Sequence, residues 1–379
     1  MREAGLTGSF WPDETQRGLL QVALGPREQA AARWQALQPL EVSHLPIGSF
    51  SVLPLLHERL AEVAPDDPQL RRLGGTSRNI WLRNQLLFEK AGLLLQRLRE
   101  HGVDALLVGG AAAVRRWYSA VGVRPALPLE LMVRPADVPE AADVCVSLGW
   151  SPRNTRDPLL RFESIERFPL LVHSGAPAAV AGLKGAESGY DTLRSRAQEL
   201  TLDDETALVL DPADALLLAC ATGARTVLPP SFQWLIDAHH IISSSSSPPP
   251  DEVAARAREL RLVEPLRATL LYLERLIETP DADRYLATLG GSRGSLREQL
   301  EFALMGAPVG RAAGPAQLVA GHLRESGDES LPKLVGSFPR YLERTWRTES
   351  LGATLETAVR KAVRQQRQAR KRSASSRAS

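Results

Sequence analysis

Two short apolar runs, residues 103–108 and 127–133, set the outline of the fold. The segment Ala-Leu-Leu-Val at 105–108 is typical of a buried strand and ends in the turn Gly109-Gly110. A helix is predicted over 111–118. The second run predicts another strand, which carries one acidic side chain, Glu130, among apolar neighbours. This part of the chain therefore predicts a sheet with helices packed against it.

The rest of the middle region continues the alternation of strands and helices. A helix over 138–148 is expected after Asp137 as its cap, and strands are expected near 158–163 and 168–172. The clearest helix is 79–100, preceded by a connector that includes Gly74-Gly75. These elements predict a small mixed sheet with helices against it.

Helical spacing dominates both ends of the chain. Residues 15–63 have apolar positions near helical spacing, and further helices are predicted over 213–221, 232–243 and successively through 251–372, with breaks at Pro280, Gly290-Gly291, 306–314 and Gly336. The run of serines and prolines at 243–250 is too simple in composition to pack and predicts a linker.

The expected class is α+β, with a small mixed sheet flanked by N-terminal helices and a C-terminal helical domain. The predicted divisions are 1–78 for the N-terminal helical region, 79–210 for the α/β core, 211–358 for the C-terminal helical domain with its linker at 243–250, and 359–379 for a basic tail.

Composition narrows the setting of the protein. With 44% hydrophobic residues, the chain of 379 can bury a sizeable core. Cys145 and Cys220 lie in apolar helical patterns, and neither belongs to a Cys-x-x-Cys motif, which favours a reducing compartment. The sequence shows no segment of signal-peptide type and no apolar run long enough for a membrane span. We therefore expect a cytoplasmic protein with no membrane contact.

The tail from 360 to 379 holds eight basic residues and no acidic ones. Such a tail binds phosphate backbones electrostatically, which makes nucleic acid a candidate partner. Aromatic side chains that could stack on bases are absent from it, so sequence-selective RNA binding is unsupported. The alternative is a solvated tail with no partner.

Two other motifs carry less weight. The segment Gly290-Gly-Ser-Arg-Gly294 matches a hydrolase nucleophile elbow by letter, but a helical segment precedes it, and Ser295 with Glu298 predicts a helix cap. His239 and His240 are adjacent, so on a helix they point in different directions and cannot comfortably share one metal.

Several motifs together resemble those of the bacterial uncharacterised nucleotidyltransferase-like family, within the DNA polymerase β-like nucleotidyltransferase superfamily. They are Gly109-Gly110, Tyr118, Arg124-Pro125, residues 132–135 (Met-Val-Arg-Pro), Asp137 and residues 148–150 (Leu-Gly-Trp). Trp34 and residues 53–56, 211–218 and 234–237 extend the resemblance to roughly residues 15–280.

The resemblance implies a nucleotide site with Gly109, Gly110, Arg124 and His173 as binding residues and Glu130 as the acid for metal and catalysis. Magnesium would be needed only if the protein is active. In the family, two acids spaced two apart and a third on a later strand hold a pair of cations. Here the first acid position is Pro128 and the third is Leu171, and the family's lysine falls on Gly109. Two of the three metal-binding acids are therefore absent.

Three functions remain open. The first is a degenerate fold retained as a module that binds a nucleotide or a protein partner. The second is an active Mg²⁺-dependent enzyme that moves a nucleoside monophosphate from a nucleoside triphosphate to a hydroxyl acceptor. The third is nucleic-acid binding through the tail. For the site residues the plainer alternatives are an ion pair of Glu130 with Arg124 or Arg134, an ordinary turn at Gly109-Gly110, and a hydrogen-bonded histidine at a strand end for His173.

Overall fold

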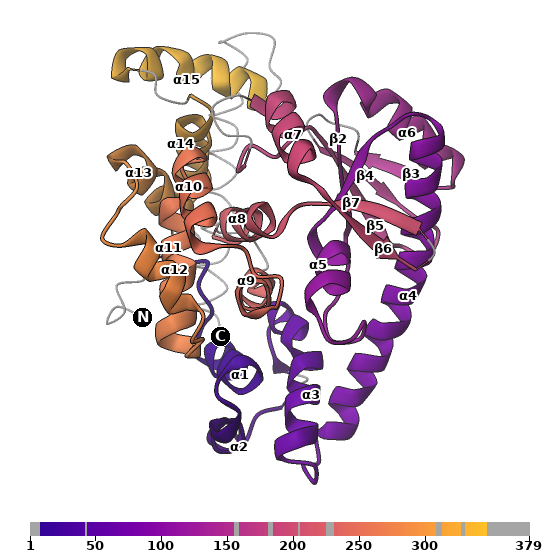
Figure 1. Ribbon diagram of the computed structural model, residues 1–379, viewed down its shortest axis with the longest axis vertical. Helices are drawn as coiled ribbons and strands as arrows, with labels where there is room; N and C mark the ends of the chain where they lie inside the picture. The colour runs from indigo at the N-terminus through magenta and orange to yellow at the C-terminus, as the bar shows by residue number, and fades with distance from the viewer. Residues whose placement is uncertain are drawn as a thin grey trace, which may run out of the picture.

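The computed structural model describes residues 8–41, 44–154, 159–180, 185–203, 205–224, 231–307, 313–326 and 330–346. They form one seven-stranded mixed sheet beside helices that come from both ends of the chain (Figure 1). The predicted α+β class is confirmed. The predicted basic tail lies outside the described residues, as does the end of the predicted C-terminal domain.

The sheet has the strand order β3-β4-β5-β2-β1-β7-β6. At its centre β1 runs antiparallel to β2 and parallel to β7, while β2 runs parallel to β5. The other neighbouring pairs are antiparallel. The strands are β1 (Ala105–Val108), β2 (Leu129–Val133), β3 (Ser151–Asn154), β4 (Leu159–Glu163), β5 (Pro169–Ser174), β6 (Gln198–Leu202) and β7 (Glu205–Val209).

Strand alternation gives each face of the sheet its own helical cover. Leu107 and Leu131 share an apolar cluster with residues of α4 (Leu70–Glu100) and α6 (Val138–Ser147). Leu106, Val108 and Met132 point the other way, into the cluster formed by the terminal helices. Two further helices lie next to strands in the sequence: α5 (Gly109–Trp117) follows β1, and α7 (Gly185–Arg196) precedes β6.

One expected cap is wrong. Asp137 lies at the end of a short 3₁₀ turn, Pro135–Asp137, and its side chain makes no capping hydrogen bond to α6.

The N-terminal helices are α1 (Glu14–Leu24), α2 (Arg27–Ala36) and α3 (Leu53–Val63), with a 3₁₀ turn at Ile47–Val52 before α3. The expected start of the next helix at residue 79 is wrong, because α4 begins at Leu70 and passes through Gly74-Gly75. Each glycine costs a helix about 1 kcal/mol relative to alanine. Packing of α4 on α3, with Leu73 fully buried, offsets that cost.

The C-terminal helices pack tightly to one another and to α1. They are α8 (Pro212–Gly223), α9 (Gln233–Ser243), α10 (Pro250–Glu259), α11 (Val263–Tyr272), a π-helical turn (Leu273–Ile277), α12 (Ala282–Leu289), α13 (Leu296–Met305), α14 (Ala313–Glu325) and α15 (Leu331–Trp346). Gly336 lies inside α15, so the helix break expected there is wrong.

The expected unpacked linker at 243–250 is also wrong. Ser243 ends α9 and Pro250 begins α10, and the short connection between them is held in place. Pro248 is buried, and its carbonyl accepts a hydrogen bond of 2.7 Å from the Tyr285 hydroxyl. A neighbouring arginine, Arg284, donates to the Ser247 hydroxyl at 2.8 Å.

The start of the chain completes the core of the C-terminal helices. Phe10 and Trp11 are both buried. The Trp11 ring stacks on Tyr272 at a centroid distance of 5.0 Å and lies 5.6 Å from Trp234. Terminal segments that are far apart in sequence therefore share one apolar cluster.

Two predictions about buried thiols and membranes can be compared with the structure. Cys145 and Cys220 are buried free thiols, as expected, and burial raises the pKa of each to about 12. Within the described ranges, none of the helices has both the length and the apolar character needed to cross a bilayer.

Candidate functional site

The start of α5, directly after β1, needs both of its glycines. Gly109 has a φ of +66°, in the left-handed region that favours glycine, and a Cβ there would lie 2.8 Å from Oε1 of Glu130. A Cβ on Gly110 would lie 2.4 Å from the carbonyl oxygen of Ala126. The glycines therefore allow the start of α5 to approach the segment leading into β2. The predicted strand and the helix after it are confirmed, but α5 begins at Gly109 and not at the predicted residue 111, so the two glycines are its first residues.

Glu130 on β2 meets His173 on β5. The distance from Oε2 of Glu130 to Nε2 of His173 is 3.3 Å, and both side chains are mostly buried. The alternative pairing of Glu130 with an arginine is wrong, because Arg124 pairs with Asp237 and Arg134 pairs with Asp191. The single acid and the histidine that the resemblance picked out are thus in contact.

The two missing acids would have faced the same side as Glu130. Leu171 is the register partner of Glu130 in the parallel pair of β2 and β5, and paired residues in a ladder share a face. Pro128 precedes Glu130 by two positions and lines the same cavity. Among the described residues there is no group of three or more His, Cys, Asp or Glu side chains that could hold a metal ion. The donors therefore do not fit a pair of cations.

Arg124 is buried and its guanidinium is fully engaged by the protein. Its Nε and Nη2 donate to the two carboxylate oxygens of Asp237 at 2.7 and 2.6 Å, and its Nη1 donates to the carbonyl of Pro125 at 2.6 Å. Burial lowers the pKa of Arg124, but the Asp237 carboxylate more than offsets this, so the pKa is raised overall. The guanidinium stays charged and paired.

Asp237 collects further donors that the sequence did not single out as a site. The hydroxyl of Tyr118 donates to it at 2.5 Å, and Gln233 on the same helix donates at 3.3 Å. Burial, followed by the Asp237 charge, raises the pKa of Tyr118 well above its usual value. Asn84 on α4 fixes the same loop from the other side, since its amide donates to the carbonyls of Val121 and Arg124.

His239 and His240 are half-buried beside this cluster and face different neighbours. His239 contacts the Thr279 hydroxyl at 3.0 Å, while the ring of His240 lies 4.2 Å from that of Tyr118. Burial lowers the pKa of His239 to about 3 and that of His240 to about 4. The prediction that the two rings point in different directions agrees with these contacts.

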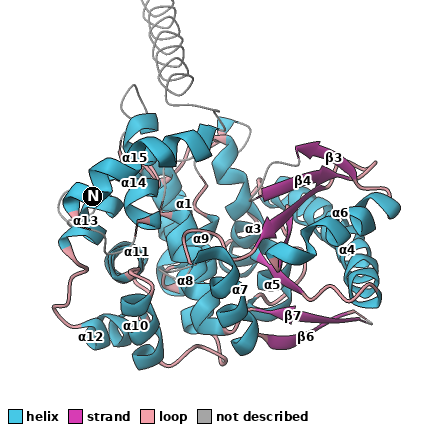
Figure 2. Ribbon diagram, turned by 90° about the horizontal axis from the view of Figure 1, so that it is seen from above, coloured by secondary structure: helices cyan, strands magenta, loops and turns pink. Residues whose placement is uncertain are grey.

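One cavity, of about 370 Å³, brings the predicted site residues together. Gly109, Gly110, Arg124, Glu130 and His173 all line it. Its opposite wall is formed by α8 and α9, which lie between the sheet and the other C-terminal helices (Figure 2). That wall is largely apolar and includes Leu218, Trp234 and Ile241. The volume lies in the range of small-molecule sites.

The charges around the cavity leave no cation free for an anionic ligand. Of the described lining residues, Arg124 is the one with a permanent positive charge, and Asp237 neutralises it. Glu130 adds a negative charge, and its neighbour is a histidine. A polyphosphate would therefore need to bring its own counterion, or rely on the free N–H groups at the start of α5.

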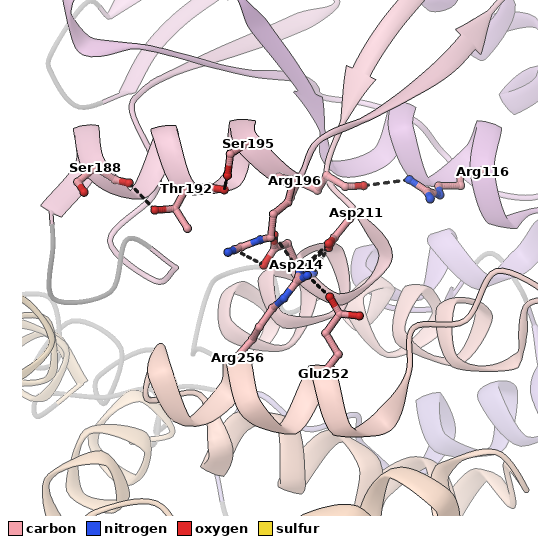
Figure 3. A network of polar contacts seen from close by, with 10 residues as sticks. Arg116, Ser188, Thr192, Ser195, Arg196, Asp211, Asp214, Glu252 and Arg256 are labelled. Atoms are coloured by element: carbon pink, nitrogen blue, oxygen red, sulfur yellow. Dashed lines mark hydrogen bonds and ion pairs between the residues drawn. The ribbon is translucent and has the colours of Figure 1, made fainter.

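A buried ionic network anchors α8, which carries part of the cavity wall (Figure 3). The fully buried carboxylate of Asp214 accepts from Arg196 at 2.8 and 2.9 Å and lies 3.1 Å from Arg256. Arg256 on α10 also binds both carboxylate oxygens of Asp211, at 2.7 and 2.6 Å. Burial raises the pKa of Asp214. The network ties α7, α8 and α10 together beside the sheet.

The hydrolase-like segment at 290–294 contributes nothing to this cavity. It forms the loop between α12 and α13, and the Ser295 hydroxyl accepts from the Glu298 amide at 3.2 Å as the cap of α13. The interpretation as a loop followed by a helix cap is confirmed.

Comparison with known protein families finds a match to the part of the chain that forms the cavity. A family model described as "Uncharacterised nucleotidyltransferase" matches residues 49–278. The match includes the whole sheet and both walls of the cavity, but it begins later than the residue 15 expected from the sequence motifs. A search of curated proteins finds no match to this chain.

Proposed function

Because the chain belongs to the uncharacterised nucleotidyltransferase family, we propose that it is a catalytically degenerate member, retained as a module that binds a Mg²⁺-nucleotide. The nucleotide phosphates would lie beside Gly109 and Gly110. The observation that carries this proposal is the number of carboxylates at the three acid positions of the family. Glu130 is the one acid among these three positions, because Pro128 and Leu171 occupy the other two.

One carboxylate is compatible with binding but not with the family's chemistry. Mg²⁺ is commonly held by one or two carboxylates when substrate phosphates and water complete its shell. Two-metal phosphoryl transfer needs ligands for cations about 4 Å apart and a group that activates the attacking hydroxyl. Glu130 alone can hold one Mg²⁺, but it meets neither of these two requirements.

The electrostatics of the cavity support the same proposal. The Arg124 guanidinium is already neutralised by Asp237, so a bare triphosphate would meet the Glu130 carboxylate without a compensating cation. A cation carried in by the nucleotide removes that repulsion and links Glu130 to the phosphates. Backbone N–H groups at the first turn of α5 can bind the remaining phosphate oxygens. The apolar wall of α8 and α9 is left for the base and sugar.

Isothermal titration calorimetry with each of the four common nucleoside triphosphates tests the binding. We expect binding that requires Mg²⁺, is lost in EDTA, and weakens by about tenfold or more in Glu130→Gln. Glu199→Gln, on the exposed part of β6, is the matched control and should bind as the wild type does. No binding with Mg²⁺ present, or tight binding accompanied by turnover, would contradict the proposal.

A restoration experiment separates degeneracy from the active-enzyme alternative. The double variant Pro128→Asp/Leu171→Asp replaces both missing acids, and transfer of a labelled nucleoside monophosphate with Mg²⁺ or Mn²⁺ should appear in it. Adding Glu130→Ala should remove that activity again. If the wild type already labels an acceptor, and Glu130→Ala abolishes the labelling, the protein is an active transferase.

A further inference from the structure

A separate feature lies away from the cavity, on the outward face of α4. This helix of 31 residues runs along an outer edge of the molecule (Figure 1). Three leucines, Leu82, Leu86 and Leu93, are 53%, 41% and 49% exposed. Their spacing of four and seven places them on one stripe of the helix. Single exposed apolar residues are ordinary, but Leu82 and Leu86 are neighbours on the helix surface and Leu93 lies on the same stripe. A group of exposed apolar side chains on one stripe is a feature of interaction surfaces.

The charges on this stripe are also unpartnered. Arg78 lies one turn before Leu82, and Glu89 lies between Leu86 and Leu93. Both are exposed, and neither forms an ion pair or hydrogen bond within the described part of the chain. Gly75, at the start of the stripe, has open space around the position of its missing Cβ.

The order of residue types along the stripe is self-complementary. Asn84 is the centre of this order. Leu82 and Leu86 lie two positions before and after it, and Gly75 and Leu93 lie nine positions before and after it. Arg78 lies six positions before it and Glu89 five positions after it. If a second copy of α4 crosses this one in the antiparallel direction near residue 84, leucine meets leucine at the centre. Arg78 of each copy then meets Glu89 of the other, and Leu93 fits over the glycine.

We propose that α4 is the interface of a two-fold symmetric homodimer formed through the stripe Gly75, Arg78, Leu82, Leu86, Glu89 and Leu93. In a two-fold interface both subunits contribute the same patch, so the residues of that patch must complement one another. The stripe meets this condition in side-chain size, apolarity and charge. Antiparallel helices pack 8–10 Å apart when side chains recur at spacings of three and four. The proposal is independent of what the cavity binds.

Sedimentation equilibrium on the full chain tests the dimer. We expect a reversible dimer near about 10 µM, and monomer at the same concentration for Leu86→Glu. Leu296→Glu, at an 85% exposed leucine on α13, is the matched control and should remain dimeric. A monomeric wild type, or equal loss of the dimer in both variants, would overturn the proposal.

A charge exchange tests the register. Arg78→Glu and Glu89→Arg should each weaken the dimer by about tenfold, since each places like charges opposite one another. The double variant should recover most of the lost affinity, because the reciprocal pairs form again with their signs reversed. A double variant that is weaker than both single ones would exclude this antiparallel register. Far-ultraviolet circular dichroism confirms folding of each variant.

Discussion

Asp237 holds side chains from two separate parts of the chain. Its carboxylate accepts from Tyr118 and Arg124, which precede β2, and from Gln233 on its own helix. Arg124 is 5% exposed, so its charge has little access to water. Removing one partner of such a buried pair leaves the other charge desolvated and unpaired.

Asp237→Ala should therefore lower the free energy of unfolding by about 3–5 kcal/mol. Asp191→Ala removes the partner of Arg134 in a half-exposed ion pair, and should change it by less than about 1 kcal/mol. Urea unfolding followed by tryptophan fluorescence measures both. Equal effects of the two substitutions would show that the Asp237 cluster contributes no more than a surface pair.

The half-buried His239 and His240 make the fold sensitive to acid. The pKa of His240 is about 4 in the folded protein against an ordinary value of 6.5. Between these two pH values the unfolded chain binds more protons than the folded one. The free energy of unfolding is therefore fully retained above pH 6.5 and decreases as the pH falls toward 4.

His240→Phe should flatten this pH dependence. From pH 6.5 to about pH 5, the free energy of unfolding of the wild type should fall by about 1.5 kcal/mol more than that of the variant, since one pKa unit corresponds to about 1.4 kcal/mol. The measurement is the change in unfolding free energy with pH, which does not depend on the baseline stability of the variant. Parallel pH profiles for the two proteins would show that His240 is protonated in the folded state.

At the level of elements, the contact between α8 and α9 sets the shape of the cavity wall. Gly223 ends α8, and a Cβ on it would lie 1.9 Å from Cγ of Trp234 on α9. The indole is buried and rigid at that atom, so the helices would have to move apart.

Gly223→Ala should cost about 1–3 kcal/mol and weaken ligand binding in the cavity. Gly291→Ala is the matched control, because a Cβ at Gly291 meets nothing within 4 Å and its φ is not in the left-handed region. Thermal unfolding of both variants, with calorimetry on the folded proteins, gives the comparison. A Gly223→Ala variant as stable as the control would mean that α9 shifts at little cost.

The elements that the sequence predicted are those with a strong local pattern. Strands β1 and β2 are apolar runs, and two glycines mark the end of β1 and the start of α5, so the order of these elements could be predicted. The segment 185–209 had no predicted element, yet it forms α7, β6 and β7. Strand β6, Gln-Glu-Leu-Thr-Leu, is mostly exposed, so its apolar content is too low to signal a strand.

The features that could not be predicted depend on contacts between residues far apart in the sequence. The cavity residues Gly109, Glu130 and His173 could be proposed from their motifs. The partner of Arg124 could not, because Asp237 lies 113 positions further along the chain. In the same way, α4 extends through Gly74-Gly75 because α3 packs on it. Helix propensity depends on the local sequence alone and could not predict this packing.

At the scale of the whole molecule, the terminal segments and the sheet depend on shared contacts. The network of Asp214 with Arg196 and Arg256 joins α7, beside the sheet, to α8 and α10. The Trp11 ring joins the start of the chain to α9 and α11. The N-terminal helices and the C-terminal helices should therefore fold in a single cooperative event.

Trp11→Ala should lower the free energy of unfolding by about 3–5 kcal/mol, because the ring is 5% exposed and stacks on Tyr272. Trp81→Ala, at a 49% exposed ring on α4, should cost less than about 1 kcal/mol. Urea unfolding monitored by circular dichroism and by fluorescence should give coincident transitions for Trp11→Ala. Two separated transitions would show that the N-terminal helices unfold on their own.

The position of Trp11 also has a consequence for biosynthesis. The surfaces that cover it, Trp234 on α9 and Tyr272 on α11, are translated more than two hundred residues later. At about 5–20 residues per second, the first helices wait on the order of 10–50 s after synthesis before their apolar side can be covered. During that interval the nascent chain exposes Phe10, Trp11 and the inner face of α1 to solvent or to a holding chaperone. Helices α9 and α11, translated long after α1, are thus the ones that cover this apolar side and end its risk of aggregation.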